Sequence, residues 1–304
     1  MNPGLLSLLQ DSPALLGTVA LLLGLLVGSF LNVVIYRLPI MLERQWREQA
    51  ESPTEESATE AAPAEAAPRF NLIEPRSCCP ACKSPIRAYQ NIPVISFLLL
   101  RGRCAHCKSP ISWRYPAVEA LTGILSALAA LHFGATPSGA LAVVVTWFLI
   151  ALTFIDLDTQ LLPDSLTLPL LWIALLASAS FPLNDGLGLP VDPRSAILGA
   201  VAGYLSLWSF YQLFRAITGK EGMGYGDFKL LAALCALLGY KMLLPIILFA
   251  ALSGAVIGIG LIASGRRGRS VPIPFGPFLA IAGYLAMLWG PQWVNAYLGL
   301  YGHR

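Results

Sequence analysis

The chain has 304 residues, of which 56% are hydrophobic and only 12% are charged. This composition excludes a water-soluble enzyme with a charge-rich surface, and it favours a protein whose main solvent is a lipid bilayer. The net charge of +3 is small and gives no reason to expect a nucleic-acid partner.

Long uncharged segments recur along the chain. They cover residues 12–36, 120–155, 165–184, 195–214, 242–265 and 270–303. A helix of roughly 20 residues crosses about 30 Å of hydrocarbon, and the segment 120–155, which is interrupted at 134–139, can cross twice. Residues 227–240 would span only about 21 Å as a helix. We therefore expect an all-α polytopic membrane protein with about eight transmembrane helices, of which the sixth is short.

The basic residues predict the orientation of these helices. Most of the 20 Lys and Arg lie in the segments 37–114, 215–229 and 266–269. With eight crossings, all three segments face the same side, which is the cytoplasm by the positive-inside rule. The N-terminus is then expected outside the cytoplasm.

Composition divides the chain into three predicted regions. Residues 1–36 hold the first transmembrane helix, residues 37–114 form a cytoplasmic domain, and residues 115–304 form a membrane-embedded domain. Within the cytoplasmic domain, residues 49–68 are rich in Ala, Glu, Pro and Ser and have little to bury, so we expect a mobile tether. Residues 76–114 are expected to form a small ordered module.

Two CxxC pairs lie in this module, Cys79-Pro-Ala-Cys82 and Cys104-Ala-His-Cys107. Two such pairs can supply four thiolates to one tetrahedral Zn²⁺, although their separation slightly exceeds the usual range. The alternative is two disulfides, which rarely persist in the cytoplasm. We therefore predict a structural zinc-like site formed by Cys79, Cys82, Cys104 and Cys107.

Carboxylates at the cytoplasmic ends of predicted helices are the candidate catalytic groups. Asp156 and Asp158 end the third crossing, Asp164 precedes the fourth, and Asp227 begins the sixth after glycines at alternating positions. Two carboxyls that share a site can hold one proton between them and activate water, as in aspartic peptide hydrolysis. We predict that Asp156 and Asp227 form this pair, with Asp164 as a helix N-cap and Asp158 as a solvated turn residue. A proton relay in a transporter remains the alternative for the same carboxylates.

Several motifs together resemble the type IV prepilin peptidases, a family of membrane aspartic proteases. The motifs are residues 28–39, both CxxC pairs, Arg101-Gly-Arg-Cys104, residues 111–119, the Asp156 segment, residues 219–227 and residues 272–280. The GxGD sequence ending at Asp227 is weak evidence by itself, but it is specific when combined with the IDxD sequence that contains Asp156.

The resemblance implies two activities at the bacterial inner membrane, with the active site facing the cytoplasm and the N-terminus in the periplasm. The first is cleavage of type IV prepilins and type II secretion pseudopilins after a glycine. The second is methylation of the new N-terminal residue, usually Phe, with S-adenosylmethionine as donor. The resemblance maps the catalytic pair onto Asp156 and Asp227, and it associates Gly102 with methyl transfer. A proton-coupled polytopic membrane transporter is the alternative function.

Overall fold

The structure is a computed structural model that describes residues 3–51, 70–180, 189–264 and 273–301. Within these residues, regular structure is helical apart from two isolated β-bridges. The predicted all-α class is confirmed. From residue 52 onward, the predicted tether at 49–68 lies outside the described residues.

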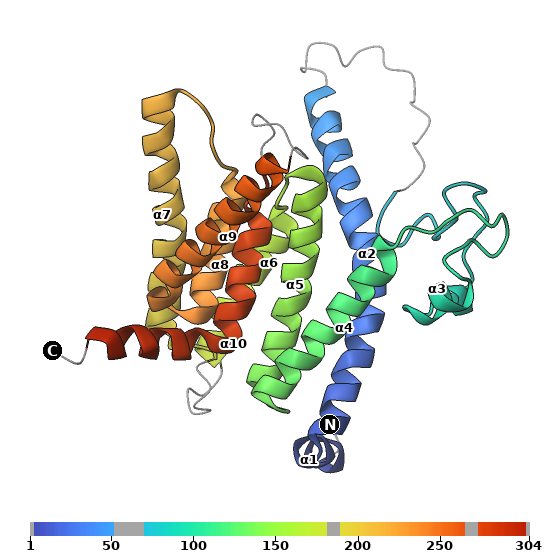
Figure 1. Cartoon of the computed structure of the whole chain (residues 1–304), viewed down its shortest axis with the longest axis horizontal. Helices are drawn as coiled ribbons and strands as arrows, with labels where there is room; N and C mark the ends of the chain where they lie inside the picture. Colours follow the sequence, from blue (N-terminus) through green and yellow to red (C-terminus); the bar gives the residue numbers. More distant parts are fainter. Residues whose placement is uncertain (1–2, 52–69, 181–188, 265–272, 302–304) are drawn as a thin grey trace, which may run out of the picture. The chain divides into compact units, whose positions relative to one another are not determined.

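The described helices are α1 (Pro3–Asp11), α2 (Pro13–Glu51), α3 (Ile95–Leu99), α4 (Arg114–Phe133), α5 (Pro137–Thr159), α6 (Asp164–Ser180), α7 (Pro193–Thr218), α8 (Tyr225–Leu238), α9 (Leu243–Ala263) and α10 (Gly276–Tyr301), with the 3-10 helices η2 (Ala88–Asn91) and η3 (Tyr240–Met242) (Figure 1). Five of the described spans are long and apolar enough to cross a membrane, namely those of α2, α4, α5, α7 and η3–α9. Helix α6 is apolar but shorter. The polytopic class is therefore confirmed, and the number of eight crossings stays a prediction.

The chain divides into two compact units. Unit 1 contains Met1–Gly24 and Thr122–Arg304, and unit 2 contains Leu25–Leu121. Helices α2 and α4 therefore contribute to both units. The predicted boundaries after residues 36 and 114 follow the expected membrane crossings rather than packing, and they stay predictions.

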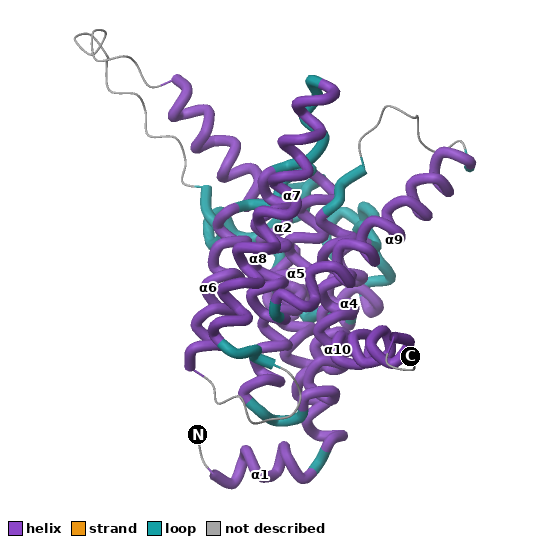
Figure 2. Tube along the Cα trace, turned by 90° about the vertical axis from the view of Figure 1, so that its left-hand side faces the viewer, coloured by secondary structure: helices purple, strands orange, loops and turns teal. Residues whose placement is uncertain are grey.

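Helix α8 forms the centre of unit 1. Its side chains are buried from Asp227 to Leu238, with Lys229 half-buried, and it packs against α6, α7 and α10 (Figures 1 and 2). The close approach of α7 depends on Gly199, because a Cβ there would collide with the carbonyl oxygen of Cys235. Such small residues let apolar helices pack backbone to backbone. Helix α8, which has 14 residues, is thus enclosed largely by protein. The short sixth transmembrane helix expected from the sequence requires such an enclosure.

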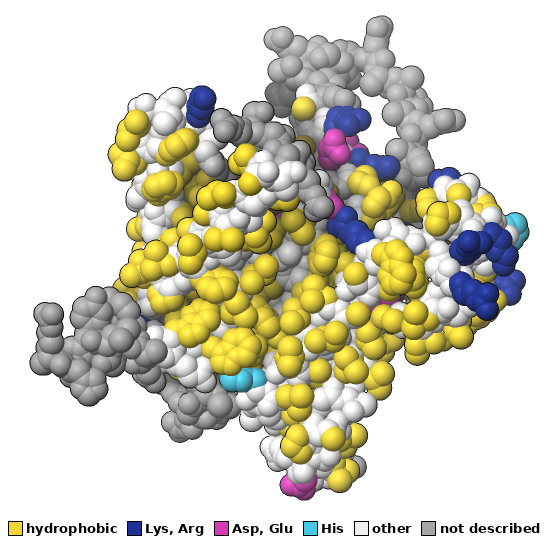
Figure 3. Space-filling view, viewed as in Figure 1, with side chains coloured by type: hydrophobic (Ala, Val, Ile, Leu, Met, Phe, Trp, Pro, Cys, Tyr) yellow, Lys and Arg dark blue, Asp and Glu magenta, His cyan; other side chains and the backbone are white. Residues whose placement is uncertain are grey.

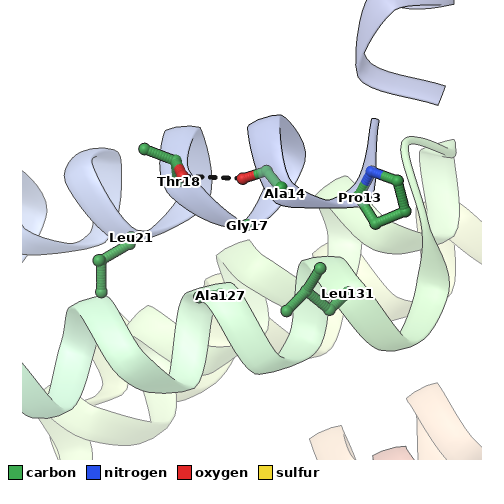
Figure 4. Close-up of a pocket in the computed structure, with 7 residues that line it drawn as sticks. All are labelled: Pro13, Ala14, Gly17, Thr18, Leu21, Ala127 and Leu131. Carbon is green, nitrogen blue, oxygen red and sulfur yellow. Dashed lines mark hydrogen bonds between the residues drawn. The ribbon is translucent and has the colours of Figure 1, made fainter. Parts of the chain in front are cut away.

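A shallow apolar groove lies in unit 1 between the start of α2 and the end of α4 (Figure 4). It is lined by Pro13, Ala14, Gly17, Thr18, Leu21, Ala127 and Leu131. The Thr18 hydroxyl already donates to the carbonyl oxygen of Ala14 at 2.7 Å. Because no lining side chain can titrate, this groove is not a candidate catalytic site.

In unit 2, residues 70–75 are fixed against α2. The buried guanidinium of Arg37 donates to the carbonyl oxygens of Asn71 at 2.9 Å and Pro75 at 2.6 Å. The guanidinium of Arg44 lies over the ring of Phe70, 4.4 Å from its centroid. These contacts position the segment that leads into the first CxxC pair.

Candidate active site and metal centre

Asp156 lies in the last turn of α5 and is 4% exposed. Its Oδ2 accepts a hydrogen bond of 2.9 Å from the backbone N–H of Gly276, the first residue of α10. A side chain at position 276 would not fit, since its Cβ would lie 2.5 Å from the same oxygen. Gly276 therefore brings the start of α10 onto the carboxylate.

Asp227 lies in the first turn of α8, close to the helix N-cap Gly224, and is 7% exposed. Its backbone N–H donates to the carbonyl oxygen of Gly224 at 3.2 Å. Its Oδ1 is buried and has no hydrogen-bond partner among the described residues. A buried carboxyl oxygen without a donor is costly, and it is available to a proton, a water or a substrate.

Leu162, in the connection between α5 and α6, lies next to both carboxyl-bearing turns. A Cβ at Gly226, the residue before Asp227, would lie 2.5 Å from Cβ of Leu162, and a Cβ at Gly276, the residue that donates to Asp156, would lie 3.1 Å from Cδ1 of Leu162. Both close approaches therefore require glycine.

The other two carboxylates predicted near this site have different surroundings. Asp158 is exposed on α5. Asp164 is the first residue of α6, and both of its oxygens accept from Nζ of Lys229, at 2.6 and 2.7 Å. The sequence predicts Asp164 as an N-cap, whereas the hydrogen bonds described for it join α6 to α8.

Sequence reasoning assigned no role to Gly276 or to Lys229. The motif at residues 272–280 pointed to this region without saying what it contacts, and the contact between Gly276 and Asp156 spans 120 positions in the sequence. In the sequence, the only sign that Lys229 belongs to this region is its position two residues after Asp227. Its partner Asp164 is 65 positions away.

The four predicted cysteines come together in unit 2. One sulfur atom from each of Cys79, Cys82, Cys104 and Cys107 lies within 4.8 Å of the other three. The sulfurs of Cys79 and Cys107 are 3.8 Å apart, which matches the sulfur–sulfur distance of about 3.8 Å expected for a tetrahedral site with Zn–S bonds of about 2.3 Å. All six cysteines are free thiols, so the alternative of two disulfides is not observed.

Both pairs have the same local structure because the same sequence follows them. Each second cysteine begins the run Cys-Lys-Ser-Pro-Ile. The N–H of Lys83 donates to the carbonyl oxygen of Cys79, and that of Lys108 donates to the carbonyl oxygen of Cys104. Both lysines have positive φ angles, 57° and 60°. This short repeat was present in the sequence and strengthens the interpretation of the pairs as equivalent knuckles.

Two of the four thiols are held in surroundings that favour the thiolate form that metals bind, whereas burial and the neighbouring thiols of Cys79 and Cys107 raise the pKa of the Cys104 thiol. The backbone N–H groups of Cys82 and Ala81 lower the pKa of the Cys79 thiol to about 6. The hydroxyl and backbone of Ser109 lower the pKa of the Cys107 thiol. Donors arranged around a sulfur stabilise its charge, so the donor set suits a cation such as Zn²⁺.

Gly102 lies immediately before the second knuckle and has a φ of +66°. Its N–H donates to the carbonyl oxygen of Phe97, and its own carbonyl oxygen accepts from Ile111. A Cβ at this position would lie 3.0 Å from the ring of Phe97 and would need a conformation that L side chains rarely adopt. The geometry gives Gly102 a structural role in the turn, and its predicted role in methyl transfer stays a prediction.

Comparisons with known proteins cover both sites. The model for the bacterial peptidase A24 N-terminal domain matches residues 22–133, which include the four cysteines, and the model for the type IV leader peptidase family matches residues 143–259, which include Asp156 and Asp227. The chain therefore belongs to the type IV leader peptidase family. This result confirms the resemblance and favours a peptidase over a transporter.

The relatives align over almost their whole length. A prepilin leader peptidase/N-methyltransferase of Aeromonas hydrophila is 52% identical over 97% of this chain and 98% of its own. Proteins of the same name are 47% identical in Pseudomonas aeruginosa, over 99% of each chain, and 46% identical in Legionella pneumophila, over 96% of this chain and 98% of the relative. No solved structure matches the chain.

Proposed function

We propose that this protein is a membrane aspartic endopeptidase that removes the leader of type IV prepilins and pseudopilins, and then methylates the new N-terminus. The observation that carries the peptidase assignment is the pair of buried carboxyls, Asp156 and Asp227, within a chain of the leader peptidase family. The methyltransferase assignment rests on the names of relatives that align from end to end.

In the proposed hydrolysis, Asp156 and Asp227 hold one proton between them. The ionised carboxyl accepts a proton from water while the water oxygen attacks the carbonyl carbon of the glycine before the scissile bond. The protonated carboxyl donates to the carbonyl oxygen, and a proton then reaches the leaving amine as the C–N bond breaks. The hydrogen bond from Gly276 orients Asp156 for this cycle, and burial excludes bulk water from the pair.

Zn²⁺ is the ion we propose for the tetracysteine cluster. Four sulfur ligands leave no open coordination position, so its role is to hold the two knuckles together rather than to take part in the reaction. The expected content is about one Zn²⁺ per chain.

S-adenosylmethionine is the proposed methyl donor, and the loop around Gly102 is its proposed site. Methyl transfer moves the sulfonium methyl group to the uncharged terminal amine, which loses a proton. The contact with Phe97 makes a simple Gly102 variant ambiguous, because Gly102→Ala introduces both a side chain and a collision. Pairing Gly102→Ala with Phe97→Leu makes room at the ring but leaves the strain of the positive φ, so lost methylation with intact cleavage in the double variant is the result that supports a donor site.

The membrane supplies the setting for both reactions. We propose that the protein is a multi-pass protein of the bacterial inner membrane, with a periplasmic N-terminus and both reactions at the cytoplasmic face. The clustered Lys and Arg support this orientation. An apolar prepilin helix in the same bilayer would keep its leader junction near the carboxyls and raise its effective concentration there.

The test uses the purified full chain in detergent with a prepilin and S-adenosylmethionine, followed by mass spectrometry of the product. We expect cleavage after glycine, and a mass increase of one methylene that depends on the donor. An intact prepilin after prolonged incubation would contradict the peptidase assignment. A cleaved but unmethylated product would contradict the second activity alone.

A further inference from the structure

Unit 2 exposes a set of large apolar side chains close to its transmembrane helices. We call this set the apolar patch, and it consists of Tyr89, Ile92, Ile95, Leu98, Leu99 and Trp113. Leu99 is 78% exposed and Trp113 is 73% exposed. Several large exposed apolar side chains in one small module mark an interaction site.

Local structure explains why these side chains point outward. Helix α3 has only five residues, and Phe97 is its one buried side chain. The ring of Phe97 packs edge-on against Trp113 at 4.8 Å between centroids and lies where a Cβ at position 102 would come. Since Phe97 faces the interior of the module, its neighbours Leu98 and Leu99 project away from it.

Hydrogen bonds fix the segment that carries the patch to both helices of unit 2. The side chain of Asn91 donates to the hydroxyl of Ser29 on α2 at 3.3 Å. The backbone N–H of Val94 donates to Oε2 of Glu119 on α4 at 2.8 Å. Val94 has a φ of 58° and forms a tight turn in which Ile95 donates to Pro93. This conformation is unfavourable for a β-branched residue, so the bond to Glu119 helps to hold it.

The attachment points determine the depth of the patch. Ser29 lies within the uncharged segment 12–36, about 12 Å along the helix axis from Arg37 at 1.5 Å per residue. Glu119 lies about 7.5 Å along α4 from Arg114 on the same basis. Both helices are apolar enough to cross a membrane. The segment is therefore tied to both helices at levels on the apolar side of Arg37 and Arg114.

The charged residues of the segment that carries the patch are all basic. Between Glu74 and Glu119 the sequence contains seven Lys and Arg and no Asp or Glu. Figure 3 shows basic side chains gathered beside apolar ones on the part of unit 2 that carries α3 in Figure 1. Basic segments next to a membrane are attracted to anionic lipids, and an aromatic residue such as Trp113, directly before α4, is typical of the membrane interface.

We propose that the apolar patch is a membrane-insertion site: its side chains enter the acyl-chain boundary of the bilayer, and the surrounding Lys and Arg bind the phosphates of anionic phospholipids. This contact lies outside the transmembrane helices themselves. It holds the tetracysteine module on the lipid surface and removes from water an apolar surface that would otherwise promote aggregation.

The test places an environment-sensitive fluorescent amino acid at Leu99 in the full chain. The protein is reconstituted in nanodiscs of phosphatidylcholine and phosphatidylglycerol that carry nitroxide lipids labelled near the top of the acyl chain. The matched control carries the same fluorophore at Ile73, which belongs to unit 2, is 83% exposed and lies outside the patch. Retained cleavage of a prepilin shows that each labelled protein is folded.

We expect blue-shifted emission and several-fold stronger nitroxide quenching at Leu99 than at Ile73. Replacing phosphatidylglycerol by phosphatidylcholine should weaken the quenching at Leu99. Equal, water-like emission at both positions would overturn the proposal. A Leu99 probe that stays in water in empty nanodiscs and becomes shielded only when prepilin is added would also overturn it, because the patch would then bind the substrate.

Discussion

Asp156 and Asp227 belong to different helices of unit 1 and are positioned only by helix packing, whereas the four cysteines of unit 2 lie on two short turns followed by the same sequence. The carboxyls depend on backbone approaches at Gly226 and Gly276. The thiols depend on hydrogen bonds within a few residues of each knuckle.

This difference predicts which substitutions should damage each region. The arrangement of two carboxyls that depends on interhelical contacts can be disrupted by one added methyl group where the backbones pack closely. A thiol cluster held by local turns tolerates changes nearby, and it fails when a ligand is removed. The two regions should therefore respond differently to the following substitutions.

The largest effect is expected from replacing either catalytic carboxyl. Asp156→Asn and Asp227→Asn should each reduce cleavage by about 10²–10⁴-fold or more, because an amide can neither accept a proton from water nor share one with its partner. Quantitative mass spectrometry of prepilin cleavage measures this loss. Asp158→Asn is the control on the same helix, since Asp158 is exposed and should retain most of the activity. Normal cleavage by Asp156→Asn would disprove the proposed pair.

Removal of a thiol tests the other region. Cys79→Ser or Cys107→Ser should lower the bound metal from about one Zn²⁺ per chain to near none, as measured by elemental analysis. Cys78→Ser is a close control, because Cys78 lies outside the four-sulfur cluster. Cleavage should survive better than methylation in the metal-free variants. A wild-type protein without metal would contradict the zinc assignment.

The next largest effect is expected from a substitution where two segments of unit 1 pack closely, which should affect the carboxyls but not the cysteines. Gly226→Ala places a Cβ 2.5 Å from Cβ of Leu162, and such overpacking costs about 1–3 kcal/mol. We expect cleavage to fall by roughly tenfold or more, because about 1.4 kcal/mol lost from transition-state stabilisation is a factor of ten in rate, while the bound metal stays unchanged. Gly260→Ala is the matched control, since a Cβ at that helical position meets nothing within 4 Å. Equal activities of the two variants would show that the close approach at Gly226 is unimportant.

The smallest effect is expected at the ion pair between α6 and α8. Lys229 and Asp164 have side chains that are 25% and 57% exposed, so solvent screens their attraction and the pair contributes about 0–1 kcal/mol. Asp164→Asn should therefore lower the melting temperature slightly and retain substantial cleavage. Abolished cleavage in a folded Asp164→Asn protein would assign this carboxylate to the catalytic machinery.

The sequence by itself determined the solvent of this protein, its helical class and the chemistry of its candidate sites. Hydrophobic segments must form helices in lipid, because their backbones have no other hydrogen-bond partners. Cysteine spacing within each knuckle is a local property, so the sequence was sufficient to predict the cluster. The pairing of Asp156 with Asp227 stays a prediction, drawn from their common membrane face and from the family resemblance, and the contacts around each carboxyl could not be read from the sequence.

Only the tertiary structure decided how those helices contact each other. The bond from Gly276 to Asp156, the approach of Gly226 to Leu162 and the attachment of Val94 to Glu119 all join distant parts of the chain. In a uniformly apolar helix, composition does not reveal which face meets protein and which meets lipid. The meeting faces are selected by shape, through the glycines and the few buried polar groups that must find partners when the helices pack.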